Sequence, residues 1–390
     1  MLQLAIALAL MSGSGSDDGP RRDSNFVLHE WGTFTTVAGS NGVQIGGLTY
    51  DEESLPRFVY ERNHPQRGFQ HVNVKMETPV IYIYSDEERE VSLKVGFPKG
   101  LLTQWYPQVR ALDQGEKTNK TDLKNGLLDW GTFMVLAPNR GLDLLPVLEK
   151  GDSWQFARQT KANVLRNCAA RVVGDKVLAE HERFLFYRGL GDFELPVRAS
   201  AASDASVTVE NRGTDPLERF VGLRVTKDKI YFRAFEPLAA GAKTSIDTEL
   251  DEVTIDGAMD EVAALLAQAG LYKDEARAMV NTWRKSYFQT EGFRILYFVP
   301  RRLTDQILPL TVDPAPKETV RVLVGRLDVL LPAQEEKAKK TIKSAKTIEQ
   351  ARLDLGRFAE PIVRHLRDTT NDPDLRARAT ALLATEDTGR

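Results

Sequence analysis

The sequence predicts a mainly β, sandwich-like protein with an α-helical insert and a helical C-terminal tail, α+β overall. Between residues 25 and 255, short runs with apolar residues at alternate positions are separated by turns rich in Gly, Pro and Asn. Helical spacing of apolar residues first appears near residue 256 and returns after residue 333. With 390 residues, of which 42% are hydrophobic, the chain is long enough to bury more than one core.

The first residues differ in composition from the rest. Residues 1–11 are almost wholly apolar, and Ser and Gly fill residues 12–16. Eleven residues are too few to span a bilayer, which needs about 20, but they suit the apolar region of a secretory signal. The basic region that usually precedes it is missing, so an unstructured or strand-forming N-terminus is the alternative. We expect residues 1–24 to be a signal-like segment and linker, the protein to be exported to the periplasm or beyond, and no transmembrane span elsewhere.

Residues 25–200 are predicted to form one β-rich domain. The clearest strand is His71–Tyr84, because polar and apolar residues alternate strictly from His71 to Glu77. Val72, Val74 and Met76 are expected to face the core, with the polar side chains on the other face. Further strands are expected at residues 26–36, 90–95, 127–136 and 184–187.

Residues 201–255 continue the β pattern and are predicted to belong to the same unit. Strands are expected at 206–210, 221–225, 229–235 and 244–248. The corner Leu238-Ala-Ala-Gly241 precedes the last of these. This order resembles the strand and turn pattern of immunoglobulin-like bacterial modules.

Residues 256–332 are predicted to hold a helical pair followed by returning strands, with Asp256 and Asp274 as helix caps. Residues 333–390 are predicted to form a helical hairpin from residues 348–366 and 375–383. Asp372 and Pro373 are a strong start signal for its second helix. The lysine run between 337 and 346 fits a solvated helix face or a contact for an anionic partner.

Several chemistries are disfavoured by composition and by missing motifs. The formal net charge of −3 gives no reason to expect nucleic acid as a partner. No phosphate-binding loop, nucleophile elbow, Cys-x-x-Cys or dinucleotide fingerprint occurs. Cys168 is the single cysteine, which excludes an internal disulfide and is typical of a small buried residue more than of a nucleophile.

His29 and Glu30 are candidate site residues on the first predicted strand. Neighbours on a strand point to opposite faces, so Glu30 would share an apolar face with Leu28 and Phe34. A carboxyl group there needs an ion-pair partner, such as Arg188 or Arg294, or has a raised pKa suited to a general acid.

His71 and Glu77 lie six residues apart on one strand face, about 20 Å at roughly 3.3 Å per residue. They cannot bind one metal directly, but His71 could join His29 and a carboxylate. Those ligand types suit zinc or non-haem iron. Glu30 and Glu77 are the candidate catalytic groups, and His29 and His71 the candidate metal ligands.

Five phrases together resemble a family of uncharacterised, exported bacterial proteins of planctomycete type. They are His29-Glu-Trp-Gly-Thr-Phe34, Met76-Glu-Thr-Pro-Val-Ile-Tyr82, Phe184-Leu-Phe-Tyr-Arg-Gly189, Glu291-Gly-Phe-Arg-Ile-Leu-Tyr297 and Val324-Gly-Arg326. The likeness spans most of residues 25–332. It implies export and a β-rich architecture, and it implies no mechanism.

Two functions remain open on the sequence alone. The first is a non-catalytic envelope protein that binds a partner or a glycan through the sandwich surface. The second is a hydrolase, with or without a metal ion, that gathers His29, Glu30, His71 and Glu77. The second requires the two histidines to lie close together beside a carboxylate in a cleft.

Overall fold

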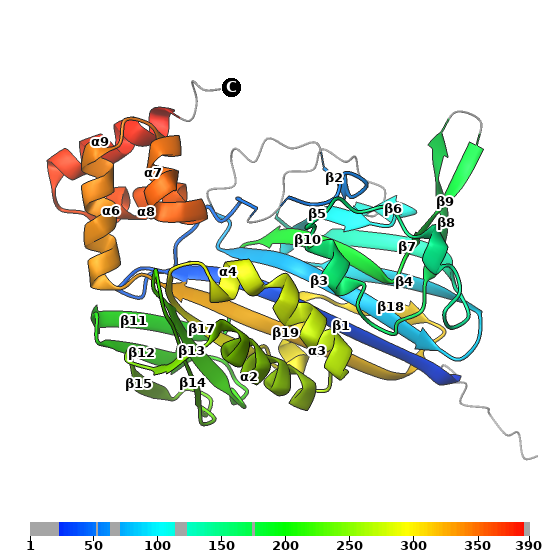
Figure 1. Cartoon of the computed structure of the whole chain (residues 1–390). Helices are drawn as coiled ribbons and strands as arrows, with labels where there is room; N and C mark the ends of the chain where they lie inside the picture. Colours follow the sequence, from blue (N-terminus) through cyan, green and yellow to red (C-terminus); the bar gives the residue numbers. More distant parts are fainter. Residues whose placement is uncertain (1–22, 52–53, 63–70, 114–122, 174–175, 386–390) are drawn as a thin grey trace, which may run out of the picture.

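The computed structural model describes residues 23–51, 54–62, 71–113, 123–173 and 176–385, and its fold is mostly β with a helical C-terminal region (Figure 1). This confirms the predicted fold class. Within these residues no helix is both long and apolar enough to cross a bilayer. The predicted N-terminal signal lies outside the described residues, as does the Cys168 side chain.

A ten-stranded sheet forms the centre of the molecule. Its two long central strands, β1 and β19, run parallel, and β1 also pairs with β3 in the antiparallel sense. In spatial order the strands are β16 (Asp251–Val253), β14 (Ile230–Phe235), β13 (Phe220–Val225), β17 (Gly292–Phe298), β19 (Pro316–Val329), β1 (Asp23–Ala38), β3 (Val74–Ser85), β10 (Phe184–Gly191), β5 (Gly100–Tyr106) and β2 (Tyr60–Glu61).

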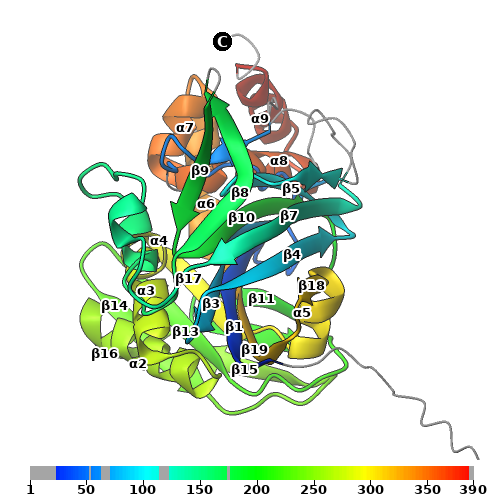
Figure 2. The same cartoon turned by 90° about the vertical axis from the view of Figure 1, so that its right-hand side faces the viewer.

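Two smaller sheets pack against one face of the large sheet and complete a sandwich (Figure 2). Apolar side chains of all three sheets, such as Phe34, Leu93 and Val209, belong to one buried cluster. The six-stranded sheet contains β18 (Leu310–Asp313), β4 (Arg89–Phe97), β7 (Gly126–Val135), β8 (Leu165–Val173) and β9 (Lys176–Glu182), with β6 (Ala111–Leu112) paired to β7. The three-stranded sheet contains β11 (Val197–Ser203), β12 (Ser206–Asn211) and β15 (Lys243–Asp247).

Helices cover the other face of the large sheet (Figures 1 and 2). Trp31, Tyr82 and Leu223 share a second apolar cluster with side chains of these helices. The helices are α1 (Trp154–Ala157), α2 (Ile255–Gln268), α3 (Lys273–Thr282) and α4 (Arg284–Phe288). A short helix, α5 (Arg301–Ile307), precedes β18.

The first two long helices start earlier than the sequence indicated. Thr254, rather than Asp256, caps α2, because its hydroxyl accepts a hydrogen bond from the Gly257 amide at 3.0 Å. α3 begins at Lys273, so Asp274 lies inside its first turn. An acidic residue there still interacts favourably with the helix dipole.

The C-terminal region contains four helices, where the sequence predicted a hairpin. They are α6 (Pro332–Ser344), α7 (Ile348–Leu355), α8 (Ala359–Thr369) and α9 (Pro373–Ala384), with a short 3-10 turn, η3 (Gly356–Phe358), between α7 and α8. The predicted helix 348–366 is interrupted because Gly356 adopts a φ of 69°. Asp372 caps α9 as expected, accepting from the amides of Asp374 and Leu375. These helices share a core of their own.

β3 differs from its predicted burial pattern. The alternation of Val74, Lys75, Met76 and Glu77 indicated one solvated face, yet all four residues are buried. Lys75 and Glu77 are covered because residues 49–51 and the turn η3 lie over that face, where Lys75 contacts Asp51 and Glu77 contacts Arg357. Two charged groups of this strand therefore lie inside the protein, each beside an opposite charge.

Candidate functional site

The central strand β3 carries a bulge at Thr78 and Pro79. Against β1, Trp31 pairs with Val80 and Thr33 with Glu77, and against β10, Phe186 pairs with Val80 and Gly189 with Met76. β3 thus holds one more residue than either neighbour at the same place. A bulge of this kind interrupts the ladder and redirects side chains, and bulges are frequent beside active sites.

The residues at the bulge explain its geometry. Thr78 has a φ of 53°, which is uncommon for a residue with a side chain, and Pro79 cannot donate to the ladder. On β1, a Cβ atom at position 32 would lie only 2.8 Å from the Pro79 Cα, so glycine is required there. Strained backbone at such a position points to a functional role.

A pocket opens on the helical side of the sheet directly at this bulge. Its volume is about 640 Å³ including the mouth, and the space inside holds about four water molecules. Six of the lining side chains are aromatic: Trp31, Trp154, Phe184, Phe186, Trp283 and Tyr287. The remaining lining residues are Leu55, Pro56, Glu77, Thr78, Val80, Asp152, Ser153, Ala157, Arg188, Thr282 and Ser286. Its shape and lining suit one ring-shaped group.

Five polar side chains of the lining have buried atoms without a hydrogen-bond partner in the described part of the chain. These atoms are Nε and Nη1 of Arg188, Nε1 of Trp31 and of Trp283, Oγ1 of Thr78 and the hydroxyl oxygen of Tyr287. Unsatisfied buried polar atoms are costly and uncommon in native proteins. Their concentration around one pocket indicates donors held ready for a ligand.

Among the described residues, Arg188 shares its carboxylate neighbour with a second cation. Asp51 Oδ1 lies 2.6 Å from Lys75 Nζ and 3.6 Å from Arg188 Nη1. Burial alone would raise the pKa of Asp51, but the charges of Lys75 and then Arg188 outweigh it and lower that pKa. Burial lowers the pKa of Lys75 despite this partner. Asp51 therefore compensates the charge of Arg188 only in part.

Glu77 also lines the pocket, but its carboxylate is fully engaged. Oε1 accepts from Arg357 Nη1 at 2.6 Å, and Oε2 accepts from the Thr35 hydroxyl at 2.7 Å. Burial acts to raise the pKa of Glu77, but the Arg357 and Lys75 charges outweigh it and hold the pKa far below its usual range. Glu77 is therefore ionised at all ordinary pH values and neutralised by its partner.

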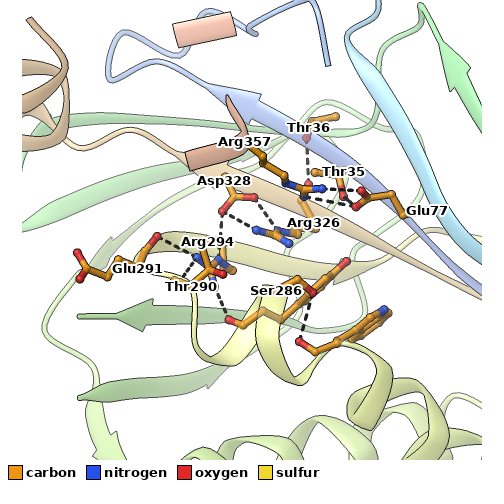
Figure 3. A network of polar contacts seen from close by, with 12 residues as sticks. Thr35, Thr36, Glu77, Ser286, Thr290, Glu291, Arg294, Arg326, Asp328 and Arg357 are labelled. Carbon is orange, nitrogen blue, oxygen red and sulfur yellow. Dashed lines mark hydrogen bonds and ion pairs between the residues drawn. The ribbon is translucent and has the colours of Figure 1, made fainter. Parts of the chain in front are cut away.

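Buried arginines hold the α4 wall of the pocket against the sheet (Figure 3). Arg294 on β17 donates to the carbonyl oxygen of Thr290 at 2.7 Å and to that of Tyr287, and its Nε lies 3.1 Å from Asp328 on β19. Arg326 also donates to Asp328, at 2.6 Å. Burial alone would raise the pKa of Asp328, but these two guanidinium groups lower it.

The same network continues as a stack into the pocket. The guanidinium carbon of Arg326 lies 4.5 Å from the Tyr287 ring centroid, and the Tyr287 and Trp283 rings are parallel within 6° at 4.4 Å. Such stacking fixes aromatic rings more firmly than apolar contact alone. The pocket wall is thus preorganised.

The opposite wall is fixed through α1. Trp154 Nε1 donates to Glu182 Oε2 at 2.8 Å, and Arg158 Nη2 donates to the same oxygen at 2.7 Å. Glu182 lies at the end of β9. This pairing anchors α1 to the strands beside it.

The residues proposed from the sequence as catalytic or metal-binding lie in separate places. His29 Nδ1 lies 2.8 Å from Glu275 Oε2 of α3, and Tyr84 donates to the other oxygen of Glu275 at 2.7 Å. Glu30 points to the opposite face, where Arg321 and Tyr187 contact it. Its arginine partner is therefore Arg321, not Arg188 or Arg294.

His71 is exposed and lies far from His29. On β1, Thr35 lies six residues from His29, which is roughly 20 Å along the strand, and Thr35 pairs with Lys75 of β3. His71 precedes Lys75 in the chain and lies beyond this pair, on the side away from His29. Across the described ranges, no three His, Cys, Asp or Glu side chains gather as a set of metal ligands. The structure therefore brings Glu77 alone, among the four proposed residues, to the pocket.

Sequence reasoning missed Arg188 as a ligand-binding residue, and it missed Asp51 and Trp283. One signal was present: Thr78-Pro79 interrupts the strongest predicted strand, and proline inside a strand marks a bulge. Three of the five phrases, those containing Trp31, Glu77 and Arg188, meet at this pocket. The other two supply Arg294 and Arg326 of the supporting network.

Comparisons with known proteins give little further information. No family model matches the chain, and no curated protein matches it. Among solved structures, the chain is similar to the yeast delta-COP-I mu-homology domain complexed with a Dsl1 WxWxV peptide. The sequence identity is 7%, the match covers 79% of this chain and 97% of that chain, and the TM-score is 0.28. A second structure of the yeast domain gives 8% identity, 80% and 98% coverage and a TM-score of 0.26. TM-scores this low support no conclusion about function.

Proposed function

We propose that this protein is a non-catalytic binding protein that holds one ring of an anionic ligand in the pocket at the β3 bulge. The observation that carries the proposal is Arg188, which is 7% exposed and has two nitrogens without a hydrogen-bond partner in the described part of the chain, among aromatic side chains. A carboxylate placed there would accept charge-assisted hydrogen bonds from the guanidinium group. These hydrogen bonds would offset the desolvation penalty of the buried Arg188 guanidinium group.

The surrounding groups fit the same ligand. Trp283 Nε1 and Thr78 Oγ1 offer further donors to a polar substituent, and the aromatic walls match the faces of a ring. Pockets of this kind are mostly apolar with a few converging polar groups. The ligand class is therefore a cyclic carboxylate.

Binding is favoured over hydrolysis by the state of Glu77. A general acid needs a pKa near the working pH, whereas the pKa of Glu77 is depressed and both its oxygens are occupied. Its contacts suit a residue that holds Arg357 in place. A hydrolase built on His29, Glu30, His71 and Glu77 gains no support from their separate positions.

Export remains part of the proposal, on the strength of the apolar residues 1–11. The site of action is then the periplasm or the extracellular space. Cell fractionation with N-terminal sequencing of the purified protein tests this part. Protein in the cytoplasmic fraction that retains residues 1–24 would contradict it.

Ligand binding can be tested by thermal unfolding with cyclohexanecarboxylate, benzoate and galacturonate, each beside its uncharged methyl ester. At about ten times the dissociation constant, a bound ligand stabilises the folded state by about 1.4 kcal/mol, which raises Tm by about 1 to 3 °C. We expect at least one carboxylate to raise Tm and its ester to leave it unchanged. Equal shifts for acid and ester, or no shift with any of the three acids, would refute the proposal.

A further inference from the structure

A larger hollow, which we call the vestibule, lies beside the pocket. It is lined by residues 149–153 and 156, by residues 281, 282, 284 and 285 at the α3–α4 junction, and by Ser54 and Gln289. Asp152, Ser153 and Thr282 line both spaces, so the two are adjacent. The vestibule has a volume of about 1210 Å³ including open solvent. A ligand longer than the pocket would reach the vestibule across these three residues.

The polar groups of the vestibule are largely available. The side-chain amides of Asn281 and Gln289 make no hydrogen bond to the residues that the structure describes. Each amide offers donors and an acceptor. That combination matches sugar hydroxyl groups, which both donate and accept.

Positive side chains outnumber negative ones in the vestibule once its ion pairs are set aside. Lys150 and Lys285 have no carboxylate within 4.0 Å in the described ranges, whereas Arg284 is neutralised by Asp256 at 2.7 Å and Glu149 lies 3.6 Å from Arg57. Asp152, which lines both spaces, has no cation within 4.0 Å among the described residues and offsets part of this positive charge. The two lysines and Arg188 still leave an excess of positive charge, which attracts a chain with repeated negative charges.

From these observations we infer that the ligand is an acidic oligosaccharide, whose terminal sugar fills the pocket while the following sugars lie in the vestibule. This inference rests on the proposed function. The aromatic pocket, of single-ring size, suits a pyranose acid, and the half-buried Phe156 offers a further ring face to the next sugar. A peptide fits less well, because the vestibule is made of a turn and helix ends and offers no strand edge for backbone pairing.

Isothermal titration calorimetry with galacturonate and its dimer, trimer and tetramer tests the inference. We expect the trimer to bind at least about tenfold more tightly than the monomer, a difference of about 1.4 kcal/mol. The double variant Lys150→Gln/Lys285→Gln should reduce this gain to less than about threefold. Lys227→Gln, an exposed lysine in the turn between β13 and β14, is the matched control and should keep the full gain.

The other outcomes distinguish failure of the oligosaccharide inference from failure of the proposed function. Monomer binding through Arg188 without a gain in affinity with chain length would overturn the oligosaccharide inference and leave the proposed function intact. Tighter binding of an acidic peptide, such as a glutamate tetramer, than of the uronate tetramer would also overturn it. No binding of any uronate, with benzoate bound, would refute the sugar ligand, while no binding of any cyclic acid would refute the proposed function itself.

Discussion

Glu77 Oε1 and Arg357 Nη1 lie 2.6 Å apart, which joins the central strand β3 to the turn between α7 and α8. The two side chains are each 10% exposed, so the pair links the β sandwich to the C-terminal helices through a buried contact beside the pocket. Breaking a buried pair by removing one partner costs about 3–5 kcal/mol. The contact therefore contributes to the stability of the pocket floor.

We predict that Glu77→Gln lowers the free energy of unfolding by about 3 kcal/mol at pH 7, as judged by urea denaturation. The pKa of Glu77 is lowered in the folded protein, so its contribution is fully present well above the unfolded-state pKa of about 4.3 and is lost progressively as pH falls from about 5 toward the folded-state pKa. The difference between wild type and variant should accordingly shrink between pH 5 and pH 3. A difference that stays constant over this range would show that the pair does not act through the charge of Glu77.

A second prediction concerns the anchoring of α4. Arg294→Met removes the bonds to the Tyr287 and Thr290 carbonyl groups, while Asp328 keeps Arg326 as a partner. We expect amide hydrogen exchange in residues 284–288 to accelerate by at least about tenfold, because the wall loses its attachment to β17. Arg233→Met, on the exposed face of β14, serves as the control and should leave exchange there unchanged. Unchanged exchange in Arg294→Met would contradict this role.

His29 gives a third prediction. Its bond to Glu275 at 2.8 Å is buried and connects β1 to α3, away from the pocket lining. His29→Ala should lower the free energy of unfolding by about 1–3 kcal/mol, because the buried Glu275 carboxylate loses one of its hydrogen-bond partners and keeps the Tyr84 hydroxyl and the Tyr272 amide. Affinity for a cyclic carboxylate should not change, and metal content measured by elemental analysis should equal that of the wild type. Loss of a stoichiometric metal in the variant would instead favour a metal site at His29.

The strands were predictable where the local sequence carries a simple pattern. Residues 206–210 in β12 were recognised because apolar and polar residues alternate, and residues 184–187 in β10 and 221–225 in β13 because they are short, mostly apolar runs. β5 and β8 were missed because Gln104, Arg166 and Asn167 break the alternation and are accommodated by contacts from distant segments. Local sequence cannot report such contacts.

The pocket was beyond sequence reasoning for the same reason. Its Arg188 comes from β10, its Trp283 from the end of α3 and its Glu77 from β3, so only tertiary packing brings them together. The predicted alternation over 71–77 assigned Lys75 and Glu77 to a solvated face, because their partners Asp51 and Arg357 are 24 and 280 residues away. The phrases around Trp31, Glu77 and Arg188 were recognised, but their convergence was not.

Calorimetric titration of wild type and Arg188→Met with the tightest acid from the panel tests whether Arg188 binds the carboxylate of a cyclic ligand. Truncating one partner of a buried charge pair costs about 2–5 kcal/mol, so affinity should fall by about 30-fold or more while the Arg233→Met control binds as the wild type does. The methyl ester of the acid should bind both proteins with equal, weak affinity. Equal affinity of wild type and Arg188→Met for the acid, with both proteins folded, would contradict the account.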